Sequence, residues 1–258
     1  MEIQFGYFPT PYADDYPAIV RTVRLAETLG LDLVGIQDHP YHRKHMDTWT
    51  LLAALAAQTE RIRLFPDVAS LPLRPPATLA KAAASLDLIS DGRFELGLGA
   101  GAMWDPIEAI GGPRRSPAEA VAALSEAIDV IRLLWSDQPS ASFEGAHYRL
   151  RGAKPGPRPA HDIGIWLGAY KPRMLRLIGR KADGWLPSSS YVDPTRLHEQ
   201  NSLISEAATE AGRDPAGIRR LYNIFGRITD GESHDRHDGP VQQWVDELTE
   251  LTNEQGMT

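Results

Sequence analysis

Two kinds of hydrophobic pattern alternate along the chain. Short apolar runs, typical of buried strands, are followed by longer segments in which apolar residues recur every three or four positions, as on one face of a helix. In the first long segment, residues 14–29, Ile19, Val23 and Ala26 share such a face, and Gly30 follows where helices commonly end on glycine. The pattern therefore predicts a strand at residues 3–8 and a helix at residues 14–29.

The same pair of patterns recurs through the chain. The helix after Ser116 is the clearest prediction, because Ser116 and Glu119 form a capping box and Pro117 takes the first helical position. A polar segment rich in proline and glycine, residues 136–161, interrupts the alternation with a small hairpin near residues 143–150. The further predicted strands are residues 33–37, 62–68, 94–98, 163–167, 184–187 and 221–228, and the further predicted helices are residues 48–59, 77–89, 117–135, 172–181, 194–211 and 240–252.

Strict alternation of strands and helices predicts a parallel sheet with right-handed crossovers. A TIM barrel has eight such pairs and takes about 250 residues. We therefore expect one α/β domain over residues 1–258, a TIM (β/α)8-type barrel with an excursion after strand 4 and an incomplete last β/α unit. Residues 253–258 resemble the approach to an eighth strand. Because a barrel that lacks one strand exposes two edges, a truncated chain is favoured over a barrel that closes differently.

Composition narrows the function classes. Hydrophobic residues make up 42% of the chain, which is enough for a sizeable core, and the net charge of −7 comes without a basic stripe. Nucleic acid and anionic membranes are therefore excluded as expected partners. The absence of cysteine excludes disulfides, thiolate nucleophiles and cysteine-ligated metals. The N-terminal residues lack a basic signal-peptide region, and the longest apolar run, residues 51–57, is too short to cross a bilayer, so we expect a cytoplasmic protein.

The carboxyl ends of barrel strands carry the reactive groups, and the second strand ends at Asp38 and His39. Histidine is the side chain best suited to proton transfer near neutral pH, and a neighbouring carboxylate can orient it. The alternative is that Asp38 caps a turn and His39 is a passive loop residue.

His42 and His45 follow His39 at intervals of three residues, a spacing that would suit a metal-dependent barrel hydrolase. Pro40 interrupts a regular helix face, and the basic residues 43–44 disfavour a bound cation, so we expect no metal. The polar run of residues 234–238 lies between two glycines and predicts a solvated loop.

Small residues follow three other strands. Val68, Ala69 and Ser70 follow the third, residues 97–102 form a glycine-rich turn after the fourth, and Gly168, Ala169 and Tyr170 precede a helix with a basic N-terminal turn. Such turns let a ligand approach the backbone, and a helix N-terminus favours an anion. Each turn alone is compatible with an ordinary loop. Together they favour a flat, phosphorylated cofactor, without the G-x-G-x-x-G pattern of a dinucleotide fold.

The chain resembles the luciferase-like monooxygenase superfamily of flavin- and deazaflavin-dependent oxidoreductases. The resemblance is carried by FGYF (5–8), LDLVGIQDHPY (31–41), LPLRPPATLAKAAASLDLISDGRFELGLGAG (71–101), LSEAIDVIRLLW (124–135) and IWLGAYKPRMLRLIGRKADGWLPS (165–188). It implies a TIM-like barrel with a reduced cofactor at its mouth. The Asp-His pair is similar to the deazaflavin-using branch, so the resemblance favours coenzyme F-420 (8-hydroxy-5-deazaflavin), with FMN as the alternative.

The resemblance also implies roles for individual residues. Asp38 and His39 would lie at the reactive ring, and a non-prolyl cis peptide within residues 67–70 would support it. The other cofactor-binding residues would be Val68, Ala69, Ser70, Ala100, Gly101, Gly168, Ala169 and Tyr170.

One residue departs from the resemblance. Ala102 stands where some deazaflavin-dependent dehydrogenases carry a glutamate, which disfavours a sugar-phosphate substrate. We expect an oxidoreductase or monooxygenase acting on a small organic substrate, as a homodimer and with a flavin or deazaflavin reductase as a possible partner. The alternative is a non-catalytic flavin-binding or partner subunit on the same scaffold.

Overall fold

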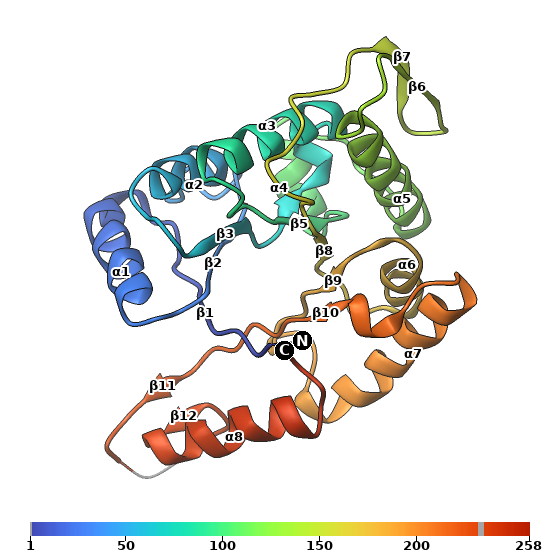
Figure 1. Cartoon of the computed structure of the whole chain (residues 1–258). Coiled ribbons are helices and arrows are strands. Elements are labelled where there is room, and N and C mark those ends of the chain that lie inside the picture. Colours follow the sequence, from blue (N-terminus) through green and yellow to red (C-terminus); the bar gives the residue numbers. More distant parts are fainter. Residues whose placement is uncertain (1, 232–234) are drawn as a thin grey trace. The chain divides into compact units, whose positions relative to one another are not determined.

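The computed structural model describes residues 2–231 and 235–258 (Figure 1). The chain divides into two compact units, one of residues Gln4–Trp166 and one of residues Leu167–Thr258 with the first residues of the chain. The single domain expected over residues 1–258 stays a prediction.

The first unit begins with a parallel sheet in the order β1-β2-β3. Val34 of β2 pairs with Leu64 of β3, and every residue of β2 is buried. The first helix buries Ile19, Val23 and Ala26, which confirms the predicted face. The elements are β1 (Gly6–Tyr7), α1 (Tyr16–Thr28), β2 (Leu33–Ile36), α2 (Thr48–Ala56) and β3 (Arg63–Pro66).

A second pair of parallel strands follows in the same unit. Ser70 of β4 pairs with Gly99 of β5. Gly97 is required on β5, because a Cβ atom there would lie 2.0 Å from the carbonyl oxygen of Pro66. The Ser116 capping box is present, as predicted. The elements are β4 (Ala69–Ser70), α3 (Pro76–Ile89), β5 (Leu96–Gly99), α4 (Trp104–Ala109) and α5 (Pro117–Leu134); α4 was not predicted.

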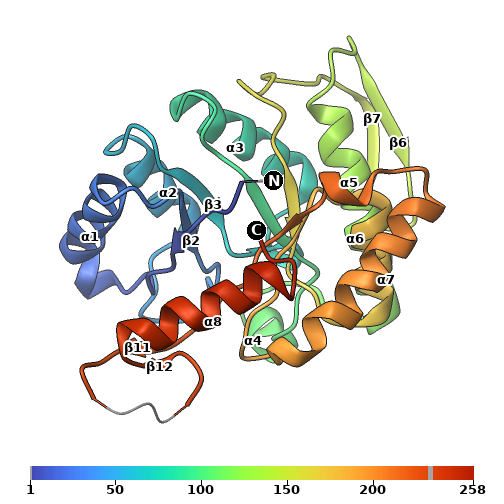
Figure 2. The ribbon, with the colours of Figure 1, turned by 60° about the horizontal axis from the view of Figure 1, so that its bottom comes forward.

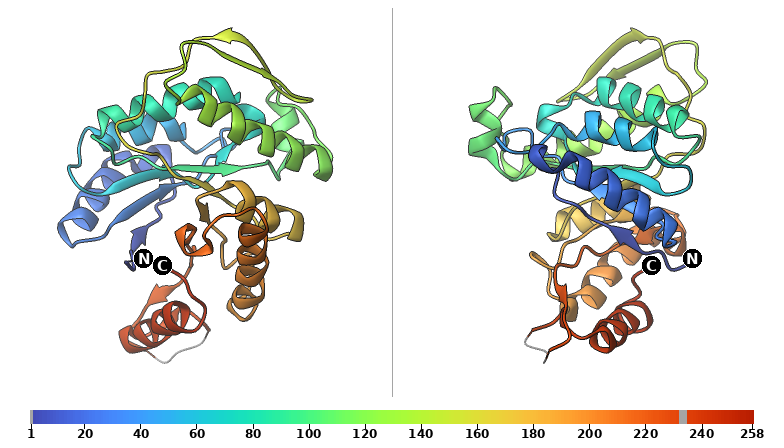
Figure 3. Two further views of the ribbon diagram at one scale, coloured as in Figure 1. Left: turned by 45° about the vertical axis from the view of Figure 1, so that its right-hand side comes forward. Right: turned by 90° about the vertical axis from the view of Figure 1, so that its left-hand side faces the viewer.

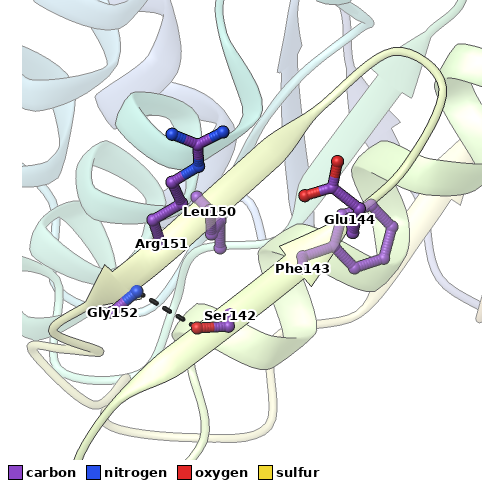
Figure 4. A pocket seen from close by; sticks show the side chains of 6 residues that line it. All are labelled: Ser142, Phe143, Glu144, Leu150, Arg151 and Gly152. Atoms are coloured by element: carbon purple, nitrogen blue, oxygen red, sulfur yellow. Dashed lines mark hydrogen bonds between the residues drawn. The ribbon is translucent and has the colours of Figure 1, made fainter.

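The predicted hairpin is formed by β6 (Ala141–Glu144) and β7 (Arg149–Ala153), beside α5 (Figure 3). Its loop is fixed by Glu126 of α5, whose carboxylate accepts the backbone N–H groups of residues 146–148. Glu27 of α1 accepts those of residues 60–62 in the same way. A hollow on the hairpin is lined by Ser142, Phe143, Glu144, Leu150, Arg151 and Gly152, and none of the predicted site residues lines it (Figure 4).

A partly buried ionic cluster ties the end of the 136–161 segment to α3 and to Glu95, the residue directly before β5. His161 contacts Asp87 of α3 through Nδ1 at 2.8 Å, and its backbone N–H donates to the same carboxylate. Its Nε2 lies 3.5 Å from Glu95, which also accepts from Arg63. The hydrogen bond to Glu95 raises the pKa of His161 above its ordinary value, in spite of partial burial, and the charges of both carboxylates act in the same direction.

The second unit starts within β8 (Ile165–Leu167) and contains a parallel pair, β9 (Gly184–Trp185) and β10 (Arg219–Arg220). Helices α6 (Pro172–Lys181) and α7 (Leu197–Glu210) run side by side in Figure 2, and they approach closely at Gly179, where a Cβ atom would lie 2.3 Å from the carbonyl oxygen of Ile204.

The strand predicted at residues 221–228 is wrong as a single element. The pairing with β9 starts earlier, at Arg219, and a separate strand β11 (Arg227–Ile228) pairs with β12 (Asp238–Gly239). The change of partner occurs at Gly226, where a Cβ atom would lie 1.7 Å from the carbonyl oxygen of His237. Helix α8 (Val241–Asn253) follows, and the backbone N–H of Thr258 then donates to the carbonyl of Arg220 at 2.7 Å.

The prediction of a solvated loop at residues 234–238 is wrong at His237, because this residue is buried, with 3% of its surface exposed. Its backbone N–H donates to Glu247 of α8, and its ring packs against Trp244. Residue 234 lies outside the described residues. Within residues 2–231 and 235–258, no helix is both long enough and apolar enough to cross a membrane.

Candidate functional site

Asp38 follows β2 and is 2% exposed. Its Oδ2 atom accepts the backbone N–H of Ser70 at 2.9 Å and Nε of Arg74 at 2.8 Å, and its Oδ1 atom accepts Nη2 of Arg74 at 2.7 Å. This bidentate pair holds the start of the loop after β2 against the end of β4.

Arg74 extends the same network to α2. It donates to Asp47, the N-cap residue of that helix, at 2.7 Å, and lies over the ring of Trp49. Burial alone would lower the pKa of Arg74, but its hydrogen bonds and the charges of Asp38 and Asp47 outweigh burial and raise that pKa. Arg74 therefore stays charged and keeps both carboxylates paired.

His39 is half-buried, and its Nδ1 atom lies 2.7 Å from the hydroxyl oxygen of Tyr41. Burial lowers the pKa of His39; Asp38 opposes this effect and His42 adds to it. The imidazole is therefore neutral near neutral pH and can accept a proton. The predicted orienting partner was Asp38, but both oxygens of its carboxylate are engaged by Arg74 and Ser70, and the ring of His39 instead contacts the hydroxyl of Tyr41.

The other two histidines of the loop form an aromatic cluster with Tyr12. The rings of His42 and His45 have centroids 3.9 Å apart, and Tyr12 lies 5.3 Å from His45. Burial lowers the pKa of His45, with His42 and His39 acting in the same direction. Within residues 2–231 and 235–258, no group of three or more histidine, cysteine or acidic side chains is placed to hold a metal.

The carboxyl ends of β4 and β5 present small residues. The non-prolyl cis peptide expected within residues 67–70 is present between Asp67 and Val68. Ala69 and Ser70 are buried, whereas Val68, Ala100 and Gly101 remain partly exposed. Gly101 has φ +97°, and a Cβ atom there would lie 2.6 Å from Pro72, so glycine is required at this turn.

Gly168, Ala169 and Tyr170 lie in the second unit, between β8 and α6. The carbonyl of Ala169 accepts the indole N–H of Trp185 at 2.8 Å. Tyr170 is exposed and stacks on Tyr191, with ring centroids 5.6 Å apart and planes 3° apart. Lys171 is the N-cap of α6, and no side chain in the described part of the protein caps this helix end.

These features fit the expected cofactor in two separate respects. Val68, directly before β4, and Ala100 and Gly101, directly after β5, present partly exposed surface of the kind that a planar ring packs against. The uncapped N-terminus of α6, with the exposed side chains of Lys171 and Arg173, has the donors and the positive charge that a phosphate requires. The structure joins Asp38, His39 and Ser70 within the first unit, and Gly168–Tyr170 belong to the second.

Two functional candidates were missed by the sequence reasoning. Arg74 lies among prolines in a segment that reads as an ordinary loop, and no local pattern signals its pairing with Asp38. Tyr41 stands in the same motif as His39, directly after Pro40. Proline at the second position of a turn was the local pattern that could have indicated a tight turn placing Tyr41 close to His39.

Known proteins are similar to this chain over most of its length. The family model described as luciferase-like monooxygenase matches residues 3–238. An F420-dependent glucose-6-phosphate dehydrogenase of Intrasporangium calvum is 32% identical over 79% of this chain and 63% of its own length. A phthiodiolone/phenolphthiodiolone dimycocerosates ketoreductase of Mycobacterium tuberculosis (strain H37Rv) is 33% identical over 90% of this chain and 60% of its own length.

The fold is similar to that of the coenzyme F420-dependent tetrahydromethanopterin reductase of Methanopyrus kandleri. The TM-score is 0.79 at 26% identity, over 92% of this chain and 69% of that one. The α/β fold is therefore of the luciferase-like TIM-barrel type, as predicted. The chain spans less than two thirds of the length of the two curated relatives. Because the family model covers most of the sequence, the chain belongs to the luciferase-like monooxygenase family.

Proposed function

We propose that the protein is an oxidoreductase that binds a reduced deazaflavin, coenzyme F-420, with FMN as the alternative, and acts on a small organic substrate. The observation that carries the proposal is the half-buried His39 at the carboxyl end of β2, one residue from the Asp38 that holds Ser70. The names of both relatives and of the similar structure support the choice of an oxidoreductase, and two of the three name F420.

When bound, the deazaflavin would supply a hydride to a substrate carbon in its reduced form, or accept one in its oxidised form. His39 would manage the accompanying proton. As a neutral imidazole it accepts the hydroxyl proton of an alcohol that is being oxidised, and as an imidazolium it returns a proton to the oxygen of a ketone that is being reduced. The lowered pKa of His39 favours the neutral form, so reduction of a ketone with the reduced cofactor requires His39 to gain a proton first. The cofactor ring would be contacted by Val68, Ala69, Ser70, Ala100 and Gly101. The phosphate group of the cofactor would be contacted by Gly168, Ala169 and Tyr170.

The substrate is proposed to be an uncharged ketone or secondary alcohol. At the carboxyl end of β5, Ala102 and Met103 are exposed and apolar. The first charged residue beyond them, Asp105, is paired with Arg114, which also donates to Glu108. A phosphate group would find no free cation in this stretch, whereas an apolar chain would contact Met103. The name of the ketoreductase relative supports the same class.

The deciding experiment is a fluorescence titration of the protein with F-420 and with FMN, each oxidised and reduced. Tight binding of the deazaflavin with hydride transfer to or from a simple ketone or secondary alcohol would support the proposal. A preference for FMN would support the oxygen-activating alternative. Binding without turnover would support a non-catalytic subunit and overturn the proposal of an enzyme.

The role of His39 is tested by comparing His39→Ala with His42→Ala, an exposed histidine of the same loop. We expect His39→Ala to lower kcat by about 100-fold or more, the usual contribution of a positioned acid–base group, while the dissociation constant of the cofactor changes little. His42→Ala should keep most of the activity. Equal kcat values for the two variants would refute the proton-transfer role.

We further propose a homodimer and, if FMN is the cofactor, a reductase that supplies it in reduced form. Apolar side chains exposed on two helices of the first unit support association, namely Leu25 of α1 and Leu88 and Ile89 of α3, together with Leu29 directly after α1. Analytical ultracentrifugation of the protein and of a Leu29→Glu variant tests the dimer. A monomeric parent protein at micromolar concentration would contradict it.

A further inference from the structure

We propose that Tyr41 is the positioning residue of His39: its hydroxyl holds Nδ1 of the imidazole and leaves Nε2 as the atom that exchanges the proton. The catalytic part of this inference rests on the proposed function. The structural part, the fixed ring with one occupied nitrogen, concerns the chain alone.

The contact is built into the backbone. His39, Pro40, Tyr41 and His42 form a tight turn closed by a hydrogen bond from the backbone N–H of His42 to the carbonyl of His39, at 2.8 Å. Proline at the second position of such a turn fixes its φ angle in advance. The turn brings Tyr41 back over His39, with ring centroids 5.4 Å apart and the hydroxyl 2.7 Å from Nδ1. The geometry is therefore built from four consecutive residues of one turn.

The other polar groups around His39 do not take the place of Tyr41. The Asp38 carboxylate is engaged by Arg74 and Ser70. The His45 ring lies 6.3 Å from that of His39, beyond direct hydrogen-bond contact, and the influence of His42 on its pKa is electrostatic. The Tyr12 ring packs on His42 and His45. Tyr41 is thus the group in hydrogen-bond contact with the imidazole in these surroundings.

A neutral imidazole has two tautomers, and the partner of one nitrogen decides what the other can do. With Nδ1 bonded to Tyr41, proton exchange is confined to Nε2, and the ring keeps one orientation. Removal of the hydroxyl would let the ring rotate and mix the tautomers. We therefore expect removal of the hydroxyl to slow the proton-transfer step and to leave the affinity for the cofactor unchanged.

The experiment compares Tyr41→Phe with Tyr12→Phe. Each variant removes one phenol hydroxyl from the side chains around this loop. Tyr41→Phe removes the hydroxyl that contacts Nδ1 of His39, whereas Tyr12→Phe leaves that contact in place. The first readout is the 15N NMR signals of the His39 ring nitrogens across a pH titration of the protein without cofactor, assigned by their loss in His39→Gln. The second is kcat, KM and the pH profile of kcat/KM with the cofactor that the fluorescence titration selects.

We expect Tyr41→Phe to shift the Nδ1 and Nε2 signals toward a mixture of tautomers, to lower kcat about tenfold or more, and to displace the pH profile, with the cofactor dissociation constant within about twofold of the parent. Tyr12→Phe should match the parent in all of these. Ring-nitrogen signals in Tyr41→Phe identical to those of the parent would overturn the proposal. Shifted signals in a protein that binds neither cofactor would support the positioning by Tyr41 and refute the proposed function instead.

Discussion

Removal of the Arg74 side chain is the perturbation whose effect the structure defines most sharply. Arg74→Ala leaves the carboxylate of Asp38, which is 2% exposed, with the backbone N–H of Ser70 as its remaining described partner. Loss of one partner from a buried ion pair lowers the free energy of unfolding by about 3–5 kcal/mol. The remaining hydrogen bond to Asp38 and the partial exposure of Arg74 favour the lower end of this range, about 3 kcal/mol. For a chain of this length that corresponds to a fall in Tm of about 6–12 °C.

The assay is urea unfolding followed by far-ultraviolet circular dichroism, because Trp49 lies beside Arg74 and would disturb a fluorescence signal. Arg158→Ala is the matched control. Arg158 pairs with Asp137 at 2.7 Å, but the two side chains are 68% and 72% exposed. Exposed pairs contribute about 0–1 kcal/mol, so this control should unfold close to the parent.

A double-mutant cycle separates the ion pair from other effects of truncation. Asp38→Asn removes the buried charge that Arg74→Ala leaves unpaired, so the double variant should be more stable than the sum of the single losses predicts, by about 1 kcal/mol or more. The reasoning is refuted if Arg74→Ala destabilises the protein no more than Arg158→Ala, or if the two losses add.

Three further predictions follow from contacts in the first unit. His161→Gln should destabilise the protein more near pH 5.5 than near pH 8.5 in urea unfolding, because a raised folded-state pKa gives stability that is present below the ordinary pKa of histidine and lost as pH rises through the raised value; an equal loss at both pH values would contradict this. Gly97→Ala should lower the free energy of unfolding by about 3 kcal/mol or more, because its Cβ atom would meet the Pro66 carbonyl at 2.0 Å, whereas Gly217→Ala, which meets nothing within 4 Å, should be near neutral in the same assay. Glu126→Gln should speed amide hydrogen exchange at residues 146–148 and leave residues 60–62 unchanged; protection retained at residues 146–148 would show that the hairpin holds its own loop.

The periodicity of the sequence predicted most of the fold because helices with one apolar face and buried strands leave local signals. Helix α6 was predicted with its observed ends, Pro172 and Lys181, and its proline at the first helical position is a local signal of a helix start. The region after Arg219 was mispredicted because its apolar residues continue through Gly226, where the chain leaves one partner strand for another. No local pattern encodes a change of partner that depends on a contact with residue 237.

The candidate site was predicted by position better than by contact. The loop after β2 and the glycine-rich turn after β5 follow strands, as predicted. Ala69 and Ser70, which were expected after a single strand over residues 62–68, instead form the separate strand β4, because β3 ends at Pro66. The partners were not predictable, because Asp38 and Arg74 lie 36 residues apart and meet through tertiary structure. The adjacent residues Asp38 and His39 suggested that their side chains interact. Neighbouring side chains at the end of a strand point in different directions, however, so Asp38 pairs with Arg74 and His39 contacts Tyr41.

Glu27 and Glu126 each bind three consecutive backbone N–H groups in the loop that they hold. Such a carboxylate recognises the peptide backbone and is indifferent to the side chains that the loop carries. Residues 60–62 and 146–148 are therefore free to change in evolution while the shape of each loop persists, and the constraint falls on two glutamates that are distant in sequence. Among relatives of this chain, the persistence of those glutamates should report loop conformation more faithfully than the loop sequences themselves.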